Sequence, residues 1–155
     1  MAWKSHIKTA LRLILGIVFC YGALDKITSP YAFAAAIDAY RILPAVVTPI
    51  SAVWLAWLEL FIGIALMVGY WTRAAAGWAI LLLSIFIFAI TSALIRDLVI
   101  PCGCFDVNDP DEVISWKKIA EDGVLLMIAV YVFISPYARW SLSKEERLSY
   151  DGKLS

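Results

Sequence analysis

Two cysteines one residue apart, in the segment Pro101-Cys102-Gly103-Cys104-Phe105, are the residues of this chain best suited to carry chemistry. A thiolate attacks a disulfide through a mixed-disulfide intermediate, so an exchange site needs an attacking thiol and a resolving thiol close by. The spacing supplies both, and Gly103 gives the backbone the freedom to close a small ring. We therefore predict a redox site at Cys102 and Cys104. The alternative that stays open is a structural disulfide or a pair of inert thiols.

The third cysteine, Cys20, lies in the first hydrophobic stretch, about four residues and so roughly 6 Å from its outer end. It faces the same side of the membrane as the Cys102–Cys104 loop, so one hypothesis makes it a relay thiol. The other makes it a small buried hydrophobe, as most lone cysteines are. We predict no metal site, because a structural zinc takes four ligands and the single histidine, His6, belongs to the opposite membrane face.

Arg12 and Glu59 are charges inside predicted membrane helices, where charged residues are costly and usually face the interior of a bundle. The structural interpretation is an ion pair between these two residues. The alternative is a quinone pocket formed by Glu59, Arg12 and Trp57, although Trp57 also fits an aromatic belt at the interface. Helical spacing puts each charge on a stripe rich in small residues, typical of close packing: Arg12, Gly16, Phe19, Cys20, Ala23 and Lys26 in one helix; Ala52, Ala56, Glu59, Gly63 and Leu66 in the next.

The elements that must position these residues are membrane helices. Of the 155 residues, 63% are hydrophobic, against roughly 45–50% in a soluble domain, and the mean hydropathy is +0.82. The net charge of zero gives no electrostatic case for nucleic acid. Four stretches predict spans at about 7–24, 49–70, 74–95 and 116–135. The fourth is the weakest, because its first turns carry Lys117, Lys118, Glu121 and Asp122. The predicted fold is all-α, a polytopic membrane four-helix bundle in contact with lipid.

Local signals refine this prediction. Thr48 is expected as the N-cap of the second span, with Pro49 in its first turn. The dipeptide Ser29-Pro30 predicts the start of a short amphipathic helix on the membrane surface between the first two spans. We expect residues 1–140 to form a single transmembrane domain and residues 141–155 to form a polar cytoplasmic tail.

Lysine and arginine set the predicted orientation. Eight of them lie on the side of the termini and five lie on the side of the cysteine loop. The positive-inside rule therefore places both termini in the cytoplasm and the Cys102–Cys104 loop outside, where an oxidising compartment suits a dithiol. In a bacterial cell this makes a multi-pass protein of the inner membrane with a periplasmic cysteine loop.

The order of these residues resembles the DoxX-like membrane proteins and, within them, the MauE branch. The resemblance covers about residues 11–134, and its most specific part is the Cys-Gly-Cys-Phe loop. It implies an inner-membrane four-helix bundle linked to disulfide formation in an exported enzyme, alongside a thioredoxin-like partner. Two positions depart from the pattern and make the outer face more acidic: Asp106 stands for the usual Gly, and Glu121-Asp122 for Arg-Asp. The resemblance rests on Arg12, Gly16, Gly22, Lys26, Phe33, Tyr40, Leu43, Pro44, Glu59, Leu60, Gly63, Gly69, Arg73 and the cysteine loop.

Two functions are compatible with this pattern. The first is a thiol–disulfide oxidoreductase in which Cys102 and Cys104 exchange with an exported thioredoxin-like protein, with quinone as the electron carrier in the membrane. The second is a non-catalytic assembly or anchoring subunit for an exported redox enzyme, in which the cysteine pair is a structural disulfide. The sequence does not decide whether the protein is an enzyme, and no cofactor other than quinone is suggested.

Overall fold

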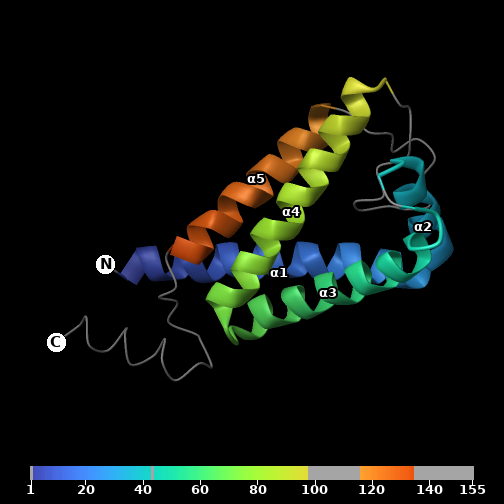
Figure 1. Ribbon diagram of the computed structural model, residues 1–155. Helices are drawn as coiled ribbons and strands as arrows, with labels where there is room; N and C mark the ends of the chain where they lie inside the picture. Colours follow the sequence, from blue (N-terminus) through green and yellow to red (C-terminus); the bar gives the residue numbers. More distant parts are fainter. Residues whose placement is uncertain (1, 43, 98–115, 135–155) are drawn as a thin grey trace.

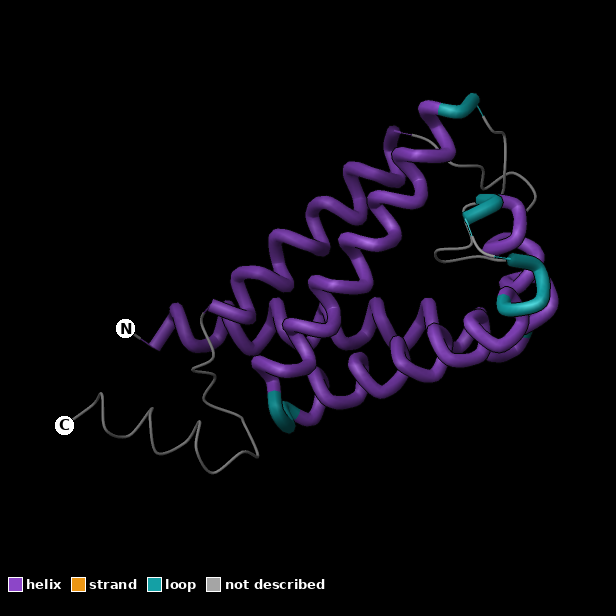
Figure 2. Tube along the Cα trace, viewed as in Figure 1, coloured by secondary structure: helices purple, strands orange, loops and turns teal. Residues whose placement is uncertain are grey.

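A computed structural model describes residues 2–42, 44–97 and 116–134, and the regular structure in these ranges is helical (Figures 1 and 2). Cys102, Cys104 and the predicted tail at 141–155 lie outside the described residues. The all-α prediction is therefore confirmed for the described part of the chain. Its helices are α1 (Ala2–Thr28), α2 (Pro30–Ala39), α3 (Thr48–Val68), α4 (Thr72–Ile95) and α5 (Trp116–Ile134).

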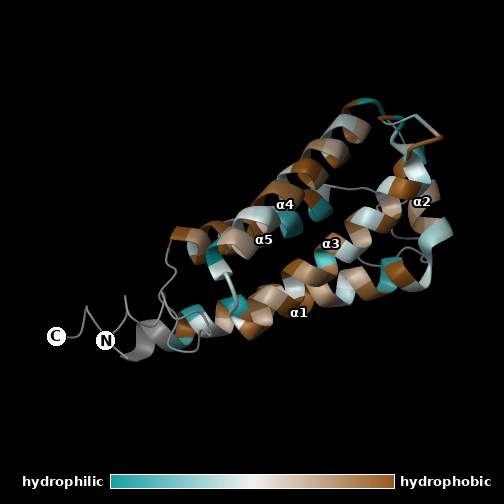
Figure 3. Cartoon of the chain, turned by 60° about the horizontal axis from the view of Figure 1, so that its bottom comes forward, coloured by the Kyte–Doolittle hydropathy of each residue, from teal (hydrophilic) through white to brown (hydrophobic). Residues whose placement is uncertain are grey.

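Three of these helices are long and apolar enough to cross a membrane. They are α1 over His6–Thr28, all of α3 and all of α4. Their outward faces carry large apolar side chains that would contact lipid, such as Phe61 on α3 and Phe88 on α4, and Figure 3 shows hydrophobic colour along most of their length. The chain is therefore a membrane protein. That α5 also spans the bilayer stays a prediction.

Helix boundaries follow the local signals closely. Ser29 precedes α2 and Pro30 opens it, as predicted, and Pro49 lies in the first turn of α3. The predicted cap of α3 is wrong by one residue: the N-cap is Val47, and Thr48 is already helical. The reason is that the Thr48 hydroxyl donates backward to the Pro44 carbonyl, at 3.2 Å, and does not cap the α3 N–H groups.

The long helices form two antiparallel pairs, α1 with α3 and α4 with α5, which converge at one end and diverge at the other (Figures 1 and 3). At the narrow end, small residues of α4 let the pairs approach closely, and an apolar core fills the junction. This core contains Leu15, Phe19, Ile62, Leu66, Ala75, Ala76, Ala79, Leu82, Leu83, Ala129 and Val132.

The short helix α2 lies at the wide end, where the pairs diverge (Figure 1). Phe33 is buried with Ala52 of α3. Just past the end of α2, Tyr40 packs with Ile90 and Ala93 of α4, and Arg96 donates from Nη1 to the Tyr40 carbonyl at 3.1 Å. The short helix predicted between the first two spans is thus present, and it links the two pairs; its location on the membrane surface stays a prediction.

The predicted stripes of small residues do form the α1–α3 contact. Gly16 and Gly63 face each other so closely that a Cβ on Gly63 would lie 2.9 Å from the Gly16 carbonyl oxygen and 2.6 Å from Cys20 Sγ. Real Cβ atoms do not come this close to backbone, so only glycine allows the observed separation of the two helices. Such close approach through small residues is how membrane helices gain packing energy in the absence of a hydrophobic effect.

The contact between Gly16 and Gly63 leads to a direct prediction. Gly63→Ala should destabilise the protein by about 1–3 kcal/mol, the usual cost of overpacking, because backbone atoms of α1 must move. Thermal unfolding of the purified protein in detergent measures the loss.

The matched control is Gly123→Ala in α5, where an added Cβ meets nothing within 4 Å. It should be neutral or stabilising by up to about 1 kcal/mol, because alanine has the higher helix propensity. Equal loss of stability in both variants would contradict the close α1–α3 contact.

Candidate functional site: a buried charge cluster between the helix pairs

A buried ion pair joins α1 to α3. Lys26 Nζ donates to Glu59 Oε2 at 2.7 Å, and the two side chains are 3% and 5% exposed. The ammonium also lies 5.3 Å from the centre of the Phe33 ring and 5.5 Å from that of Phe86. Lys26 and Glu59 belong to the predicted small-residue stripes, so helix periodicity turns them toward each other. The two aromatic rings add favourable cation–π contacts to the ammonium.

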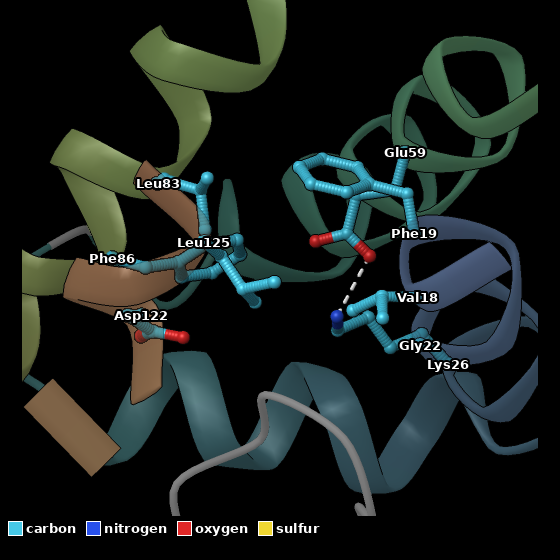
Figure 4. A pocket seen from close by; sticks show the side chains of 9 residues that line it. All are labelled: Val18, Phe19, Gly22, Lys26, Glu59, Leu83, Phe86, Asp122 and Leu125. Atoms are coloured by element: carbon cyan, nitrogen blue, oxygen red, sulfur yellow. Dashed lines mark hydrogen bonds and ion pairs between the residues drawn. The ribbon is translucent and has the colours of Figure 1, made fainter. Parts of the chain in front are cut away.

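The pair borders a cavity of about 30 Å³ between the two helix pairs. Asp122 of α5 lies across this cavity from Lys26 and Glu59 (Figure 4). Asp122 is 3% exposed, and its Oδ2 has no hydrogen-bond partner within the described residues. The cavity therefore brings together charged groups from three helices, among apolar side chains. Its lining is Val18, Phe19, Gly22, Lys26, Glu59, Leu83, Phe86, Asp122 and Leu125.

The chemistry available in this cavity is that of acids and bases. Two carboxylates and one ammonium can accept, hold and donate protons, and the space admits water. Across the described ranges, no three His, Cys, Asp or Glu side chains are grouped so as to hold a metal ion. At about 30 Å³, against the roughly 10–15 Å³ that one water needs, the cavity has room for at least two waters.

The predicted pair of Arg12 and Glu59 is wrong, because Lys26 is the partner of Glu59. Arg12 lies fourteen residues before Lys26 on the same helix, roughly 21 Å away along its axis. Arg12 is buried, at 3% exposed, as expected for an inward-facing charge. The helix face was predicted correctly and the depth was not.

The three residues of the predicted quinone pocket do not come together. Glu59 lines the cavity, whereas Arg12 and Trp57 do not. Trp57 is 48% exposed, and its ring lies tilted beside that of Phe61 on an outward face of α3. Its position fits contact with lipid.

Cys20 packs into the α1–α3 contact. Its Sγ lies 3.8 Å from Met67 Sδ, and Gly63 is directly opposite. The side chain is partly buried, an environment typical of a small hydrophobe. Its role as a relay thiol stays a prediction, as does the redox site itself, because Cys102 and Cys104 lie outside the described residues.

Sequence reasoning missed two residues of the cluster. Lys26 was on the predicted stripe of the first helix but was not assigned to Glu59. Asp122 stood out only as one of several charges at the start of the fourth span. The signal that could have identified Asp122 is its spacing from Leu125, Ala129 and Val132, at i+3, i+7 and i+10, which puts it on the apolar face of α5.

Removal of the lysine tests the importance of the ion pair. Lys26→Met should lower the free energy of unfolding by about 3–5 kcal/mol, because it leaves a carboxylate buried without its cation. The double change Lys26→Met with Glu59→Met should recover most of that loss. Lys117→Met is the control, since this side chain is 83% exposed in its pair with Glu121 and such pairs contribute at most about 1 kcal/mol. Thermal unfolding should show the largest loss of stability in Lys26→Met, a smaller loss in the double variant and the smallest in Lys117→Met. A Lys26→Met variant as stable as the control would contradict the assignment.

Comparison with known proteins agrees with the resemblance to MauE. The family model described as methylamine utilisation protein MauE matches residues 4–135. Methylamine utilization protein MauE of Paracoccus denitrificans is 29% identical over 124 residues, which is 79% of this chain and 66% of the relative. The protein of the same name from Paracoccus versutus is 34% identical over 122 residues, 78% of this chain and 65% of the relative.

The chain thus spans just under two thirds of the length of these curated relatives. No solved structure matches it. Because the family model covers all the described helices from residue 4 onward, this chain belongs to the MauE family.

Proposed function

We propose that this MauE-family protein exchanges disulfides through Cys102 and Cys104 with an exported thioredoxin-like partner. In the oxidising direction, the loop disulfide accepts two electrons from a partner dithiol and becomes a dithiol, while the partner gains a disulfide. A membrane quinone then takes two electrons and two protons from the loop dithiol, which yields quinol and restores the loop disulfide. The reducing direction is the reverse.

The observation that carries the proposal is the pair of thiols one residue apart between two helices of a MauE-family membrane protein. The described chain leaves α4 at Asp97 and re-enters α5 at Trp116, both at the wide end of the helix pairs, near α2 (Figure 1). The cysteine loop connects these two ends. An external, periplasmic position for it, with both termini cytoplasmic, is the orientation that the distribution of lysine and arginine favours.

The relatives add a biological setting. They are named for methylamine utilisation, and we extend that role to this chain, as a helper in the maturation of an exported enzyme in the bacterial inner membrane. Quinone is the proposed electron carrier because it is a two-electron, two-proton acceptor soluble in the bilayer.

Thiol trapping in native membranes tests the proposal. Across a titrated redox poise, Cys102 and Cys104 should pass between dithiol and disulfide, and a quinone analogue should shift the fraction that is oxidised. Cys102→Ser and Cys104→Ser should each abolish the exchange with little change in protein level, because the fold rests on the helix contacts.

Cys20→Ser separates the relay hypothesis from the packing hypothesis. A small hydrophobe can be replaced without loss of exchange, whereas a relay thiol cannot. A Cys102–Cys104 disulfide that persists at every accessible poise, with loss of protein when both are changed to Ser, would contradict the redox function. The protein would then be an assembly or anchoring subunit with a structural disulfide.

A further inference from the structure

The cavity at Asp122 has the size and the polarity of a water site. Its volume of about 30 Å³ exceeds the roughly 10–15 Å³ that one water molecule needs. A buried water also needs two to four polar partners, and the Lys26 ammonium, the Glu59 carboxylate and the Asp122 carboxylate all line the space (Figure 4). Asp122 Oδ2 is buried there with no hydrogen-bond partner within the described residues, so water is the natural group to satisfy it.

The charges in the cavity do not balance. Lys26 supplies one positive charge, and Glu59 and Asp122 together supply two negative charges when ionised. Helix α4 adds only the apolar side chains Leu83 and Phe86 to the lining, so it provides no counter-charge. A net charge in a buried, apolar setting is costly unless it is compensated.

Other charged groups near the cavity lie at its rim. On α5, Lys117 and Lys118 approach Glu121 at 3.8 and 3.5 Å, and Lys118 and Glu121 both act electrostatically on Asp122. On α2 the charged residue is Asp38, and on α1 Asp25 adjoins Lys26, but neither lines the cavity. Lys118, with a side chain only 13% exposed, acts on both Glu121 and Asp122 and so offsets part of the negative charge. It does not line the cavity, however, and within the lining two carboxylates still face one ammonium.

We propose that this cavity is a proton and water site, in which Glu59 and Asp122 hold one proton between them across bound water, beside the Lys26 ammonium. One added proton makes the cluster neutral. A monovalent metal ion would also balance the charge, but it would have to share a small space with the ammonium, which the proton does not. Two carboxylates that are coupled in this way titrate as a unit.

The inference is independent of the proposed redox function, because no thiol takes part in it. It adds a place inside the helix pairs where a proton is held between α3 and α5. Disulfide and quinone chemistry both move protons together with electrons, so such a site would be of direct use to either half-reaction.

Infrared spectroscopy of the purified full chain in lipid nanodiscs tests the site. At neutral pH the wild-type protein should show the C=O stretch of a protonated carboxyl group, with the shift in D2O that identifies an exchangeable proton. The band should be lost in Asp122→Asn and also in Glu59→Gln, because removal of either carboxylate leaves one acid that Lys26 alone can balance. Asp122→Glu should keep the band.

The matched control is Glu121→Gln, one residue away, where the side chain is 42% exposed at the rim. It should leave the band unchanged. Absence of a protonated carboxyl band from the wild type would overturn the proposal, as would its survival in Glu59→Gln, since the proton would then belong to Asp122 alone. Stabilisation by sodium in place of the proton, seen as a rise in unfolding temperature at high pH, would also overturn it.

Discussion

An ammonium and two carboxylates buried among apolar helices are the constraint on which this structure depends. Such groups are expensive inside a membrane unless they meet one another, so the helices that carry them must turn these faces inward. The bond between Lys26 and Glu59 and the glycine contact of Gly16 with Gly63 then act at two heights of the same helix pair. Together they fix both the rotation and the axial register of α1 against α3.

Because of this arrangement, the two ends of the molecule differ: the narrow end holds the apolar core and the wide end holds the polar cavity. At the narrow end, alanines of α4 let all four long helices meet in an apolar core. At the wide end, the pairs separate and leave room for the polar cavity, while the bond from Arg96 to the Tyr40 carbonyl ties α2 to the end of α4. The chain departs for the cysteine loop from this same end, one residue after Arg96. Stable packing and the proposed chemistry are thus kept apart.

The sequence predicted which face of each helix points inward better than it predicted the axial position at which residues of two helices meet. A period of 3.6 residues identified the inward stripes of α1 and α3 correctly, and proline signals placed the starts of α2 and α3 within a residue. Arg12 and Lys26 share one stripe, so periodicity could not say which of them meets Glu59. That choice depends on the axial register, which is set by the connection through α2 and by the glycine contact. The inward position of Asp122 likewise arises from packing between α4 and α5.

The first turns of α5 show how such packing changes the interpretation of hydropathy. Length and composition alone treat every charged residue in a helix as equally costly in a membrane. By these criteria α5 is not among the candidate spans. In the structure, Glu121 lies at the rim with two lysines, while Asp122, about 100° further round the helix, faces the cavity. A carboxylate that faces polar partners inside the protein costs far less than one that faces lipid. The polar start of α5 is therefore compatible with a fourth membrane span, and the cavity is what makes it so.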